Sequence, residues 1–348
     1  MGRGHRITAV QVCPRRGTGR DAMIITKTPL RISFFGGGSD LPEYFGRHGG
    51  AVLGTSIDKY VYLSVTRFPS KLFDYNIRVA YRKVECVGSL EQIEHSPVRE
   101  ALRLCGIERD IEISVAADLP SFSGLGSSSS FSVGLLKALH GHLGRHIGAA
   151  ELTSLAIHLE RDILREAVGY QDQVFAAYGG FNYVEFSGTR GVHVERVATS
   201  RERLEELDRS LMMFFTGVTR RAVSVERDKI ANMAAIEDNL ARMRRMVDEG
   251  LAILTSNRPL CEFGELLHRT WQEKRCLSNA VSNPVIDGLY ATAMENGAIG
   301  GKLLGAGGGG FMVLFVPPER RQRVREALQG FHEVEFSINA PGSAVIHS

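Results

Sequence analysis

The feature that most constrains this chain is a short strand that runs straight into a glycine- and serine-rich loop and then into a helix. The residue pattern predicts the strand at Ile111–Ala117 and the helix at Phe131–Leu143. Glycines at positions 124 and 126 let the backbone approach a bulky anion, because no Cβ stands in the way. The first turn of the helix adds unpaired N–H groups and the positive end of its dipole, and serines 127–130 add hydroxyl groups. The segment therefore predicts a cradle for phosphate.

Two other interpretations of this loop stay open on its residues alone. A serine-rich segment before a helix is also typical of an ordinary N-cap. A serine nucleophile of the amidase type would need a hydroxyl group in the same place. A Walker A loop is excluded, since no Lys-Ser/Thr pair closes the segment.

Two further glycine clusters lie on either side of this loop in the sequence. The first follows a predicted strand and reads Pro29-Leu-Arg-Ile-Ser-Phe-Phe-Gly-Gly-Gly-Ser-Asp40, and the second reads Lys302-Leu-Leu-Gly-Ala-Gly-Gly-Gly-Gly-Phe311. Within the second, Gly305–Gly310 formally matches the dinucleotide fingerprint G-x-G-x-x-G. That fingerprint must open a helix, whereas Phe311–Val316 continues as a strand, so we reject a dinucleotide-binding fold.

The chain is long enough for two domains, with 348 residues of which 43% are hydrophobic. Residues 1–22 are basic and rich in turn formers, and we expect either a disordered leader or an upstream start with Met23 opening the domain. We place the domains at 23–205 and 206–348, because charged Ser200–Asp208 is typical of a surface helix or linker. The alternation of strands and helices in the second half predicts the α+β class. Other predicted elements are a long helix at Glu151–Ala167 and strands at Ile77–Glu85 and His332–Ile338.

Composition restricts the kinds of partner the protein could bind and the cellular compartment in which it would work. The 42 Lys and Arg nearly balance the 39 Asp and Glu, and no segment forms a basic stripe with interleaved aromatics, so no nucleic acid is expected. The five cysteines are far apart and lack metal-ligand spacing, which favours reduced thiols and a cytoplasmic protein. No apolar run approaches the roughly 20 residues that span a bilayer, so no membrane partner is expected.

The three glycine clusters, in this order, resemble the motifs of the galactokinase, homoserine kinase, mevalonate kinase and phosphomevalonate kinase (GHMP) superfamily. The similarity covers the chain from about Met23 to its C-terminal end. It implies ATP and Mg²⁺ as cofactors and a site between two domains. The N-terminal domain would contain a left-handed βαβ unit, an exception to the usual handedness, and the C-terminal domain would be ferredoxin-like. The resemblance also implies the residues of the nucleotide loop, which are Pro120, Ser123, Gly124, Leu125, Gly126, Ser127, Ser128, Ser129 and Ser130.

Within the superfamily, three segments are most similar to the D-glycero-D-manno-heptose 7-phosphate kinases: TPLRISFFGGGSDLPEYF, SIDKYVYLSV and GYQDQVFAAYGGFNYVEF. These enzymes phosphorylate the anomeric hydroxyl, giving the 1,7-bisphosphate on the way to nucleotide-activated heptose for surface polysaccharide. Galactose-specific relatives carry a glutamate and a histidine where this chain has Gly37 and Gly38, which argues for a different or bulkier sugar. The alternatives are a kinase for an unphosphorylated sugar such as fucose or a hexosamine, and a non-catalytic sugar and ATP sensor.

Two residues match the catalytic positions of the superfamily. Asp172, in Gly169-Tyr-Gln-Asp-Gln173, corresponds to the aspartate that orients and deprotonates the acceptor hydroxyl. Arg31 corresponds to the basic residue that offsets charge on the transferred phosphoryl group. Judged alone, Asp172 could instead cap a helix and Arg31 could be a strand-surface arginine.

Glu160 is indicated by its place in the helix predicted at Glu151–Ala167. It falls at the edge of the apolar face, where a carboxylate needs a partner, and Mg²⁺ is a natural one. A salt bridge to a nearby arginine is the other interpretation. The resemblance assigns Ser128 as the hydroxyl that completes the metal site, with Ser127 as the alternative register and helix capping as the structural explanation.

The substrate side is less constrained. Asp40 resembles the ligand of a sugar hydroxyl, although it could also be an N-cap for the segment that begins at Leu41. A substrate that already bears phosphate requires a cationic pocket. The residues expected on this side are Lys27, Ser39, Asp40, Arg82, Lys83, Arg220, Gly307 and Gly308, with Arg78 as a further cationic candidate. We expect a small-molecule sugar phosphate and ATP as partners, with a homodimer as one option.

Overall fold

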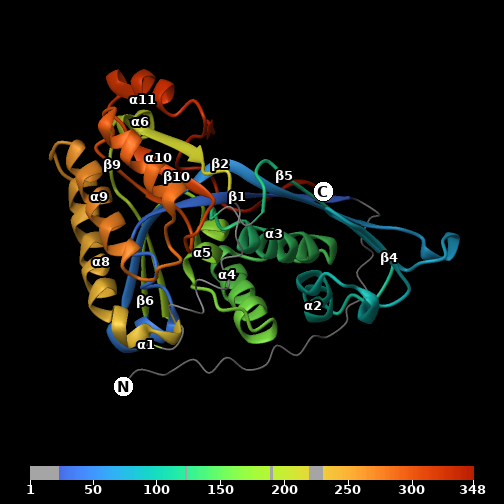
Figure 1. Cartoon of the computed structure of the whole chain (residues 1–348). Helices are drawn as coiled ribbons and strands as arrows, with labels where there is room; N and C mark the ends of the chain where they lie inside the picture. The colour runs from blue at the N-terminus through green and yellow to red at the C-terminus, as the bar shows by residue number, and fades with distance from the viewer. Residues whose placement is uncertain (1–22, 122–123, 189–190, 219–229) are drawn as a thin grey trace.

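The computed structural model of the chain describes residues 23–121, 124–188, 191–218 and 230–348, which form two β-sheets with their helices (Figure 1). Three of the sequence predictions, the leader at residues 1–22, Ser123 and Arg220, lie outside these ranges.

The first sheet has eight strands, with the order β12-β1-β2-β5-β3-β4 and with β6 pairing β2 and β7. Neighbouring strands are antiparallel except for β3 and β5, which are parallel. The longest strand, β2, is shared along its length, since Val61–Arg67 pairs with β5 and Gly50–Thr55 pairs with β6. The strands are β1 (Ile24–Phe35), β2 (Gly50–Arg67), β3 (Ile77–Ala80), β4 (Val84–Val87), β5 (Ile111–Ala117), β6 (Phe181–Ser187), β7 (Gly191–Arg196) and β12 (Ala344–His347).

Helices α2 to α5 gather on one face of the β1–β2–β5 region, as the teal ribbon of α2 and the green ribbons of α3 to α5 show in Figure 1. The central helix α3 approaches the sheet closely at Gly134, where a Cβ would stand 2.7 Å from Thr28 Oγ1 and 2.8 Å from Leu63 Cδ1. The helices of this half are α1 (Pro42–His48), α2 (Ser96–Cys105), α3 (Ser127–His142), α4 (Ala149–Ile157), α5 (Gln171–Tyr178) and α6 (Arg201–Arg209), with short 3₁₀ turns at Ser70–Leu72 and Leu90–Gln92.

The second sheet has four antiparallel strands in the order β11-β8-β10-β9. Numbered within this half, the order is 4-1-3-2 with helices between the first and second and between the third and fourth strands, which is the ferredoxin-like arrangement. The elements are β8 (Leu211–Phe215), α8 (Met233–Leu254), α9 (Cys261–Arg275), α10 (Pro284–Glu295), β9 (Gly300–Leu303), β10 (Phe311–Phe315), a 3₁₀ turn (Pro318–Arg320), α11 (Arg321–Ala327) and β11 (His332–Glu333). The α+β class and the two-part architecture predicted from the sequence are confirmed, whereas the boundary between residues 205 and 206 stays a prediction.

The chain returns to the first sheet at its C-terminal end. Strand β12 pairs with β1, with Ala344 opposite Lys27 and Val345 opposite Thr26. Just before it, the hydroxyl groups of Ser343 and Thr28 share a buried hydrogen bond of 2.8 Å. The strand that begins the described chain is therefore held in place by residues more than 300 positions away.

Three predicted elements differ from the structure. The helix predicted at Glu151–Ala167 is α-helical only to Ile157 and continues as a π-helical turn over His158–Ile163. The strand predicted at Ile77–Glu85 is the hairpin β3–β4, which turns where Tyr81 N–H donates to Lys83 O.

The strand predicted at His332–Ile338 ends at Glu333 because its backbone then changes partners. Val334 still donates to Met213 O beside β8, whereas Ser337 O accepts from Asp58 N–H of β2. The segment thus crosses from the second sheet to the first and cannot stay a strand of either.

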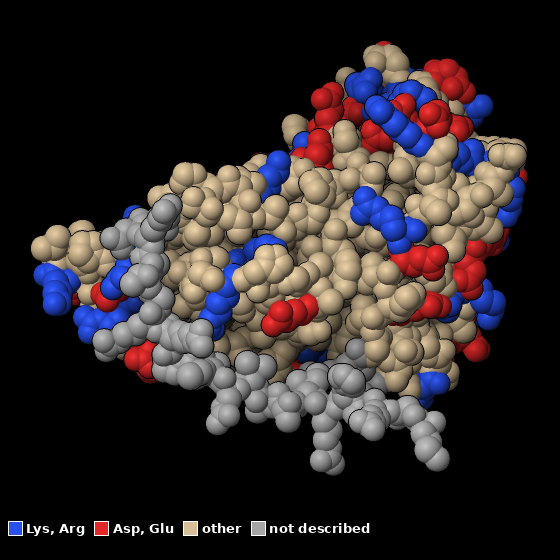
Figure 2. All heavy atoms as spheres, turned by 180° about the vertical axis from the view of Figure 1, so that it is seen from behind, with Lys and Arg blue, Asp and Glu red and all other residues tan. Residues whose placement is uncertain are grey.

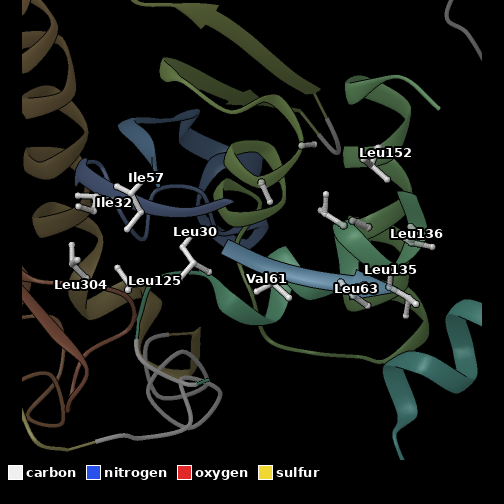
Figure 3. Packing of buried hydrophobic residues seen from close by; sticks show 14 of the residues in the cluster. Leu30, Ile32, Ile57, Val61, Leu63, Leu125, Leu135, Leu136, Leu152 and Leu304 are labelled. Carbon is white, nitrogen blue, oxygen red and sulfur yellow. The ribbon is translucent and has the colours of Figure 1, made fainter. Parts of the chain in front are cut away.

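The hydrophobic core below β1 and β2 also reaches the two loops that matter most for function. Leu63 lies beside Leu135 of α3, and Leu30, Leu125 and Leu304 belong to the same cluster (Figure 3). Leu125 belongs to the loop before α3 and Leu304 to the glycine loop after β9. Both loops are therefore anchored by one shared apolar core.

The surface reflects the balanced charge of the sequence. On the face drawn in Figure 2, basic and acidic side chains are interspersed around a broad area of uncharged residues. Among the described helices, none combines the length and the apolar character needed to cross a membrane. The four described cysteines, Cys86, Cys105, Cys261 and Cys276, are all free thiols.

Candidate active site

A pocket opens where the three glycine clusters meet. Its walls come from the end of β1, the start of α3, the segment before α5 and the glycine loop after β9. The lining residues are Arg31, Ser33, Gly37, Gly38, Asp40, Leu41, Gly124, Gly126, Ser127, Ser128, Ser129, Glu166, Val168, Gly169, Gln171, Asp172, Lys274, Lys302, Leu304, Gly305, Ala306, Gly307 and Gly309. Segments far apart in the sequence thus form a single site, as the cluster order predicts.

Arg31 and Asp172 form a two-pronged ion pair at this pocket. Arg31 lies on β1 and is 4% exposed, and Asp172 lies in the first turn of α5. The guanidinium Nε donates to Oδ1 at 2.8 Å and Nη2 donates to Oδ2 at 3.2 Å. Such a fork fixes the carboxylate in both position and plane. The pair can therefore hold an acidic hydroxyl and a transferring anion side by side.

The loop before α3 has the backbone of a phosphate site. Gly124 and Gly126 have positive φ angles of 82° and 74°, which residues with a Cβ rarely adopt. Helix α3 begins at Ser127 with Gly126 as its N-cap, so no serine side chain caps it. The first helical hydrogen bond comes from Ser130 N–H to Gly126 O, which leaves the N–H groups of Ser127–Ser129 ahead of it to face an anion.

Other residues of the predicted loop have structural contacts instead. Leu125 is fully buried in the core, and the hydroxyl of Ser130 donates to Pro29 O at 2.7 Å. Pro120 is exposed and does not line the pocket. The side chains of Ser127, Ser128 and Ser129 are those that the structure brings to the pocket wall.

Glu160 lies directly behind this wall, in the π-helical turn that follows α4. It is 1% exposed, and its Oε2 accepts hydrogen bonds from Ser129 Oγ at 2.9 Å and from Gln173 Nε2. Burial raises the pKa of Glu160 to about 7. Its other oxygen, Oε1, is buried and finds no hydrogen-bond partner among the described residues. A buried carboxylate oxygen in this state calls for a cation or a proton.

The donors around Glu160 fit a magnesium ion. One carboxylate and neighbouring hydroxyl groups are hard oxygen ligands, which Mg²⁺ prefers while keeping several water or phosphate oxygens of its own. No group of three or more His, Cys, Asp or Glu able to hold a metal is found in the described residues, so nucleotide phosphates would have to supply further ligands. The hydroxyl beside Glu160 is that of Ser129, whereas Ser128, predicted from the resemblance, is exposed at the pocket.

Asp40 braces the substrate end of the pocket. Its Oδ1 accepts from Gly38 N–H at 2.9 Å and its Oδ2 from Gln171 N–H at 3.2 Å, so it ties the first glycine cluster to the segment before α5. It does not cap α1, whose N-cap is Leu41. The neighbouring Ser39 is fully buried and donates to Gly36 O and Ala51 O, which makes it a support for the loop. Asp40 alone of these two lines the pocket.

Four of the predicted cationic residues lie outside the pocket, and the fifth, Arg220, is not among the described residues. Lys27 stands over the ring of Tyr60 at 3.8 Å from its centroid, Arg78 pairs with Glu112, and Lys83 pairs with Glu94. Arg82 is exposed near the β3–β4 turn. None of these four lines the pocket, and of the two predicted glycines Gly307 lines it, whereas Gly308 does not.

Sequence reasoning missed Lys274, Lys302 and Glu166 at this site. Lys274 continues the buried face of α9 at a spacing of three from Trp271, and a lysine in that register was the available signal. Glu166, between the π-helical turn and α5, lines the pocket, and burial raises the pKa of its carboxyl group. From the sequence, Glu166 falls inside the helix predicted at Glu151–Ala167, whereas the helical part ends before it, so helical periodicity could not indicate that Glu166 faces the pocket.

Comparison with known proteins decides the family. Residues 93–180 match the model of the GHMP kinases N terminal domain, and residues 256–333 match that of the GHMP kinases C terminal domain. A D-glycero-alpha-D-manno-heptose 7-phosphate kinase from Campylobacter jejuni is 30% identical over 335 residues, covering 92% of this chain and 97% of that protein. The chain belongs to the GHMP kinases. The family expected from the three glycine clusters is confirmed.

Solved structures of GHMP kinases agree with this assignment. A D-glycero-D-manno-heptose 1-phosphate kinase from Bacteroides thetaiotaomicron has a TM-score of 0.76 at 27% identity, covering 92% of this chain and 98% of its own. A galactokinase from Lactococcus lactis, 19% identical with a TM-score of 0.69, shares the fold. As a GHMP kinase related to sugar kinases, the chain is an ATP-dependent phosphotransferase with an alcohol group as acceptor.

Proposed function

We propose that this GHMP kinase phosphorylates the anomeric hydroxyl of D-glycero-D-manno-heptose 7-phosphate, giving the 1,7-bisphosphate for nucleotide-activated heptose and surface polysaccharide. The observation that carries the proposal is the Arg31–Asp172 pair, at 2.8 Å, beside the serine loop in a protein similar to a heptose 7-phosphate kinase. Gly37 and Gly38 support a bulky sugar, since both line the pocket without a side chain. The cytoplasm would be the compartment, because ATP and sugar phosphates are available there.

In the proposed mechanism, the N–H groups of Ser127–Ser129 bind the phosphates of ATP, and Asp172 accepts a hydrogen bond from the C1 hydroxyl. The proton of that hydroxyl passes to Asp172 while the sugar oxygen bonds to the γ-phosphorus. The bond between the γ-phosphorus and the bridging oxygen breaks, and its electron pair leaves with ADP. Arg31 offsets negative charge on the transferred group.

Glu160 and Ser129 would hold Mg²⁺ at the edge of this phosphate site, together with oxygens of the nucleotide. When bound, the ion would supply positive charge that offsets the negative charge of the nucleotide phosphates. The protein's contribution is the fixed position of Glu160, which Ser129 and Gln173 both hold by hydrogen bonds.

An ADP-release assay with four acceptors tests the substrate: heptose 7-phosphate, heptose 1-phosphate, unphosphorylated heptose and fucose. The 1-phosphate is included because the related Bacteroides protein is described as a kinase of that sugar phosphate. We expect the highest kcat/KM with the 7-phosphate, and ³¹P NMR should show a new phosphate coupled to the anomeric proton. Preference for any other acceptor would overturn the proposal. Nucleotide binding without turnover of any sugar would favour a sensor.

A further inference from the structure

Two lysines are buried in the wall of the active-site pocket. Lys274, on α9, is 5% exposed and Lys302, on β9, is 2% exposed. An ammonium group loses much hydration free energy when it is buried, so it persists there only where hydrogen bonds compensate. The atoms that Lys274 binds therefore indicate its role.

The ammonium group of Lys274 grips the start of the C-terminal glycine loop. Its Nζ donates to Leu303 O and to Gly305 O, each at 2.6 Å, so it binds the backbone on both sides of Leu304. The loop has little rigidity of its own, since Gly305 and Gly307 have positive φ angles of 69° and 120° and no side chains. Two charge-assisted hydrogen bonds from a buried helix are a strong external restraint on such a loop.

The restrained loop rests directly on the nucleotide loop. A Cβ on Gly305 would stand 2.5 Å from Gly124 Cα, and one on Gly124 would stand 2.5 Å from Leu304 O. No side chain separates the two backbones at this point. Beneath the contact, Leu304 lies beside Leu125 in the core (Figure 3). A shift of the glycine loop is therefore transmitted to Gly124.

Gly124 in turn contacts the catalytic pair. Its carbonyl oxygen accepts a hydrogen bond from Arg31 Nη1, while Nε and Nη2 of the same guanidinium bind Asp172. One continuous series of contacts thus runs from α9 through the two glycine loops to the Asp172 carboxylate. Every step in the series is a hydrogen bond or a backbone contact, with no flexible side chain between the loops.

We propose that Lys274 is a positioning residue of the active site, which holds Gly305 against Gly124 and thereby sets the phosphate loop and the Arg31–Asp172 pair for phosphoryl transfer. The proposal rests on the proposed kinase function for its catalytic consequence. Lys274, in the C-terminal half of the chain, would thus restrain a phosphate site that lies in the N-terminal half. Lys274 acts through other residues and is assigned no contact with the transferred group.

Three variants test this role. Lys274→Met removes the ammonium group and keeps most of the side-chain volume, whereas Lys274→Arg keeps a donor able to bind two carbonyls. Lys137→Met is the matched control, because Lys137 Nζ also donates to a backbone carbonyl, Ile147 O at 3.2 Å, but lies outside the pocket. For each variant we would measure the Kd of MgADP by calorimetry, then kcat and both KM values, then the unfolding temperature.

We expect Lys274→Met to weaken MgADP binding by about tenfold and to lower kcat by about 100-fold, because misplacement by an ångström can cost that much. KM for the sugar should change least, Lys274→Arg should recover most of both losses, and Lys137→Met should match the wild type. A folded Lys274→Met protein with unchanged Kd and kcat would overturn the proposal. The proposal would also be overturned if Lys274→Met and Lys274→Arg lost MgADP affinity and kcat equally, and if these losses only paralleled the fall in their unfolding temperatures.

The MgADP measurement needs no sugar, so it separates this proposal from the substrate assignment. If the wild type binds MgADP but phosphorylates no heptose phosphate, the proposed function fails while the effect of Lys274 on nucleotide affinity is still decided. If heptose 7-phosphate is turned over and Lys274→Met is as active as the wild type, only the positioning role fails.

Discussion

Asp172 binds Arg31 and, in the proposed mechanism, also accepts the proton of the acceptor hydroxyl, and a single substitution separates these two roles. Asp172→Asn keeps the side-chain shape and an oxygen for Arg31 but loses the proton acceptor. We expect kcat to fall by about 10²–10⁴-fold, the usual contribution of a general base, with MgADP affinity little changed. ADP release and calorimetry measure the two quantities. Asp287→Asn is the control, because Asp287 pairs with Arg275 at 3.2 Å outside the pocket. Near-normal kcat in Asp172→Asn would refute the assignment.

Glu160 predicts how stability depends on pH when no metal is bound. Burial raises its pKa from 4.5 to about 7, so the folded state binds more protons than the unfolded state between these values. Stability should therefore fall as pH rises from about 4.5 to about 7, by up to ~3 kcal/mol. Glu160→Gln should reduce this slope, leaving the contribution of Glu166, whose pKa burial also raises, whereas Glu265→Gln, at an exposed position on α9, should leave the slope unchanged. Unfolding temperatures of metal-free protein between pH 5 and 8 provide the measurement.

The Glu160 carboxylate should also couple the binding of Mg²⁺ to the release of protons. In the proposed site Mg²⁺ binds the ionised form of Glu160, so MgADP binding near pH 6.5 should release protons, and calorimetry in buffers of different ionisation enthalpy would detect them. Parallel stability curves for wild type and Glu160→Gln, together with no proton release, would show that Glu160 does not titrate as described.

At the scale of loops and helices, the contact between Gly124 and Gly305 can be tested with two alanines. Gly305 and Gly106 have similar positive φ angles, 69° and 72°, so alanine strains both by about 1–2 kcal/mol. Only at Gly305 would the new Cβ also collide with another backbone, since nothing lies within 4 Å of a Cβ at Gly106. We therefore expect a larger loss of stability in Gly305→Ala than in Gly106→Ala, and weakened MgADP binding in Gly305→Ala alone. Equal nucleotide affinity in both variants would argue against a functional contact.

At the scale of the whole molecule, strand β12 forms one edge of the sheet that contains Arg31. Deleting residues 344–348 removes the pairing with Ile25–Lys27. Losing a few ladder hydrogen bonds at about 1 kcal/mol each should lower the unfolding temperature by roughly 3–5 °C. Deleting Ser348 alone leaves Ala344–His347 intact and is the matched control. Unchanged melting after the longer deletion would mean that β12 contributes little to the sheet.

Much of this architecture could be predicted from local patterns in the sequence. The strand at Ile111–Ala117 was recognisable from its own residues, and the loop after it from its glycines, which adopt backbone angles that residues with a Cβ rarely reach. The serine beside Glu160 was not recognisable in this way: the resemblance indicates Ser128, with Ser127 as the alternative, whereas the hydroxyl beside Glu160 is that of Ser129. This pairing depends on the π-helical turn, which changes the direction of Glu160 relative to an α-helix.

Other site residues could not be predicted from the sequence because their positions depend on contacts between distant parts of the chain. Lys274 has the local pattern of a helix residue, and only the tertiary position of Gly305 O explains why a lysine is buried there. Four of the cationic residues predicted at the substrate side do not line the pocket, and two of them, Arg78 and Lys83, pair with Glu112 and Glu94. Spacing along the chain predicts neighbours within an element but not which elements meet.

The pairing of β12 with β1 also has a consequence for how the protein is made. A ribosome synthesises residues 24–35 early and residues 344–347 more than 300 residues later, so this sheet cannot be completed while most of the chain is still being produced. Until then the outer edge of β1 presents unpaired backbone groups, the kind of edge to which other strands can bind. The nascent chain should therefore depend most on chaperones at this edge, and a slow step in refolding should be the docking of β12.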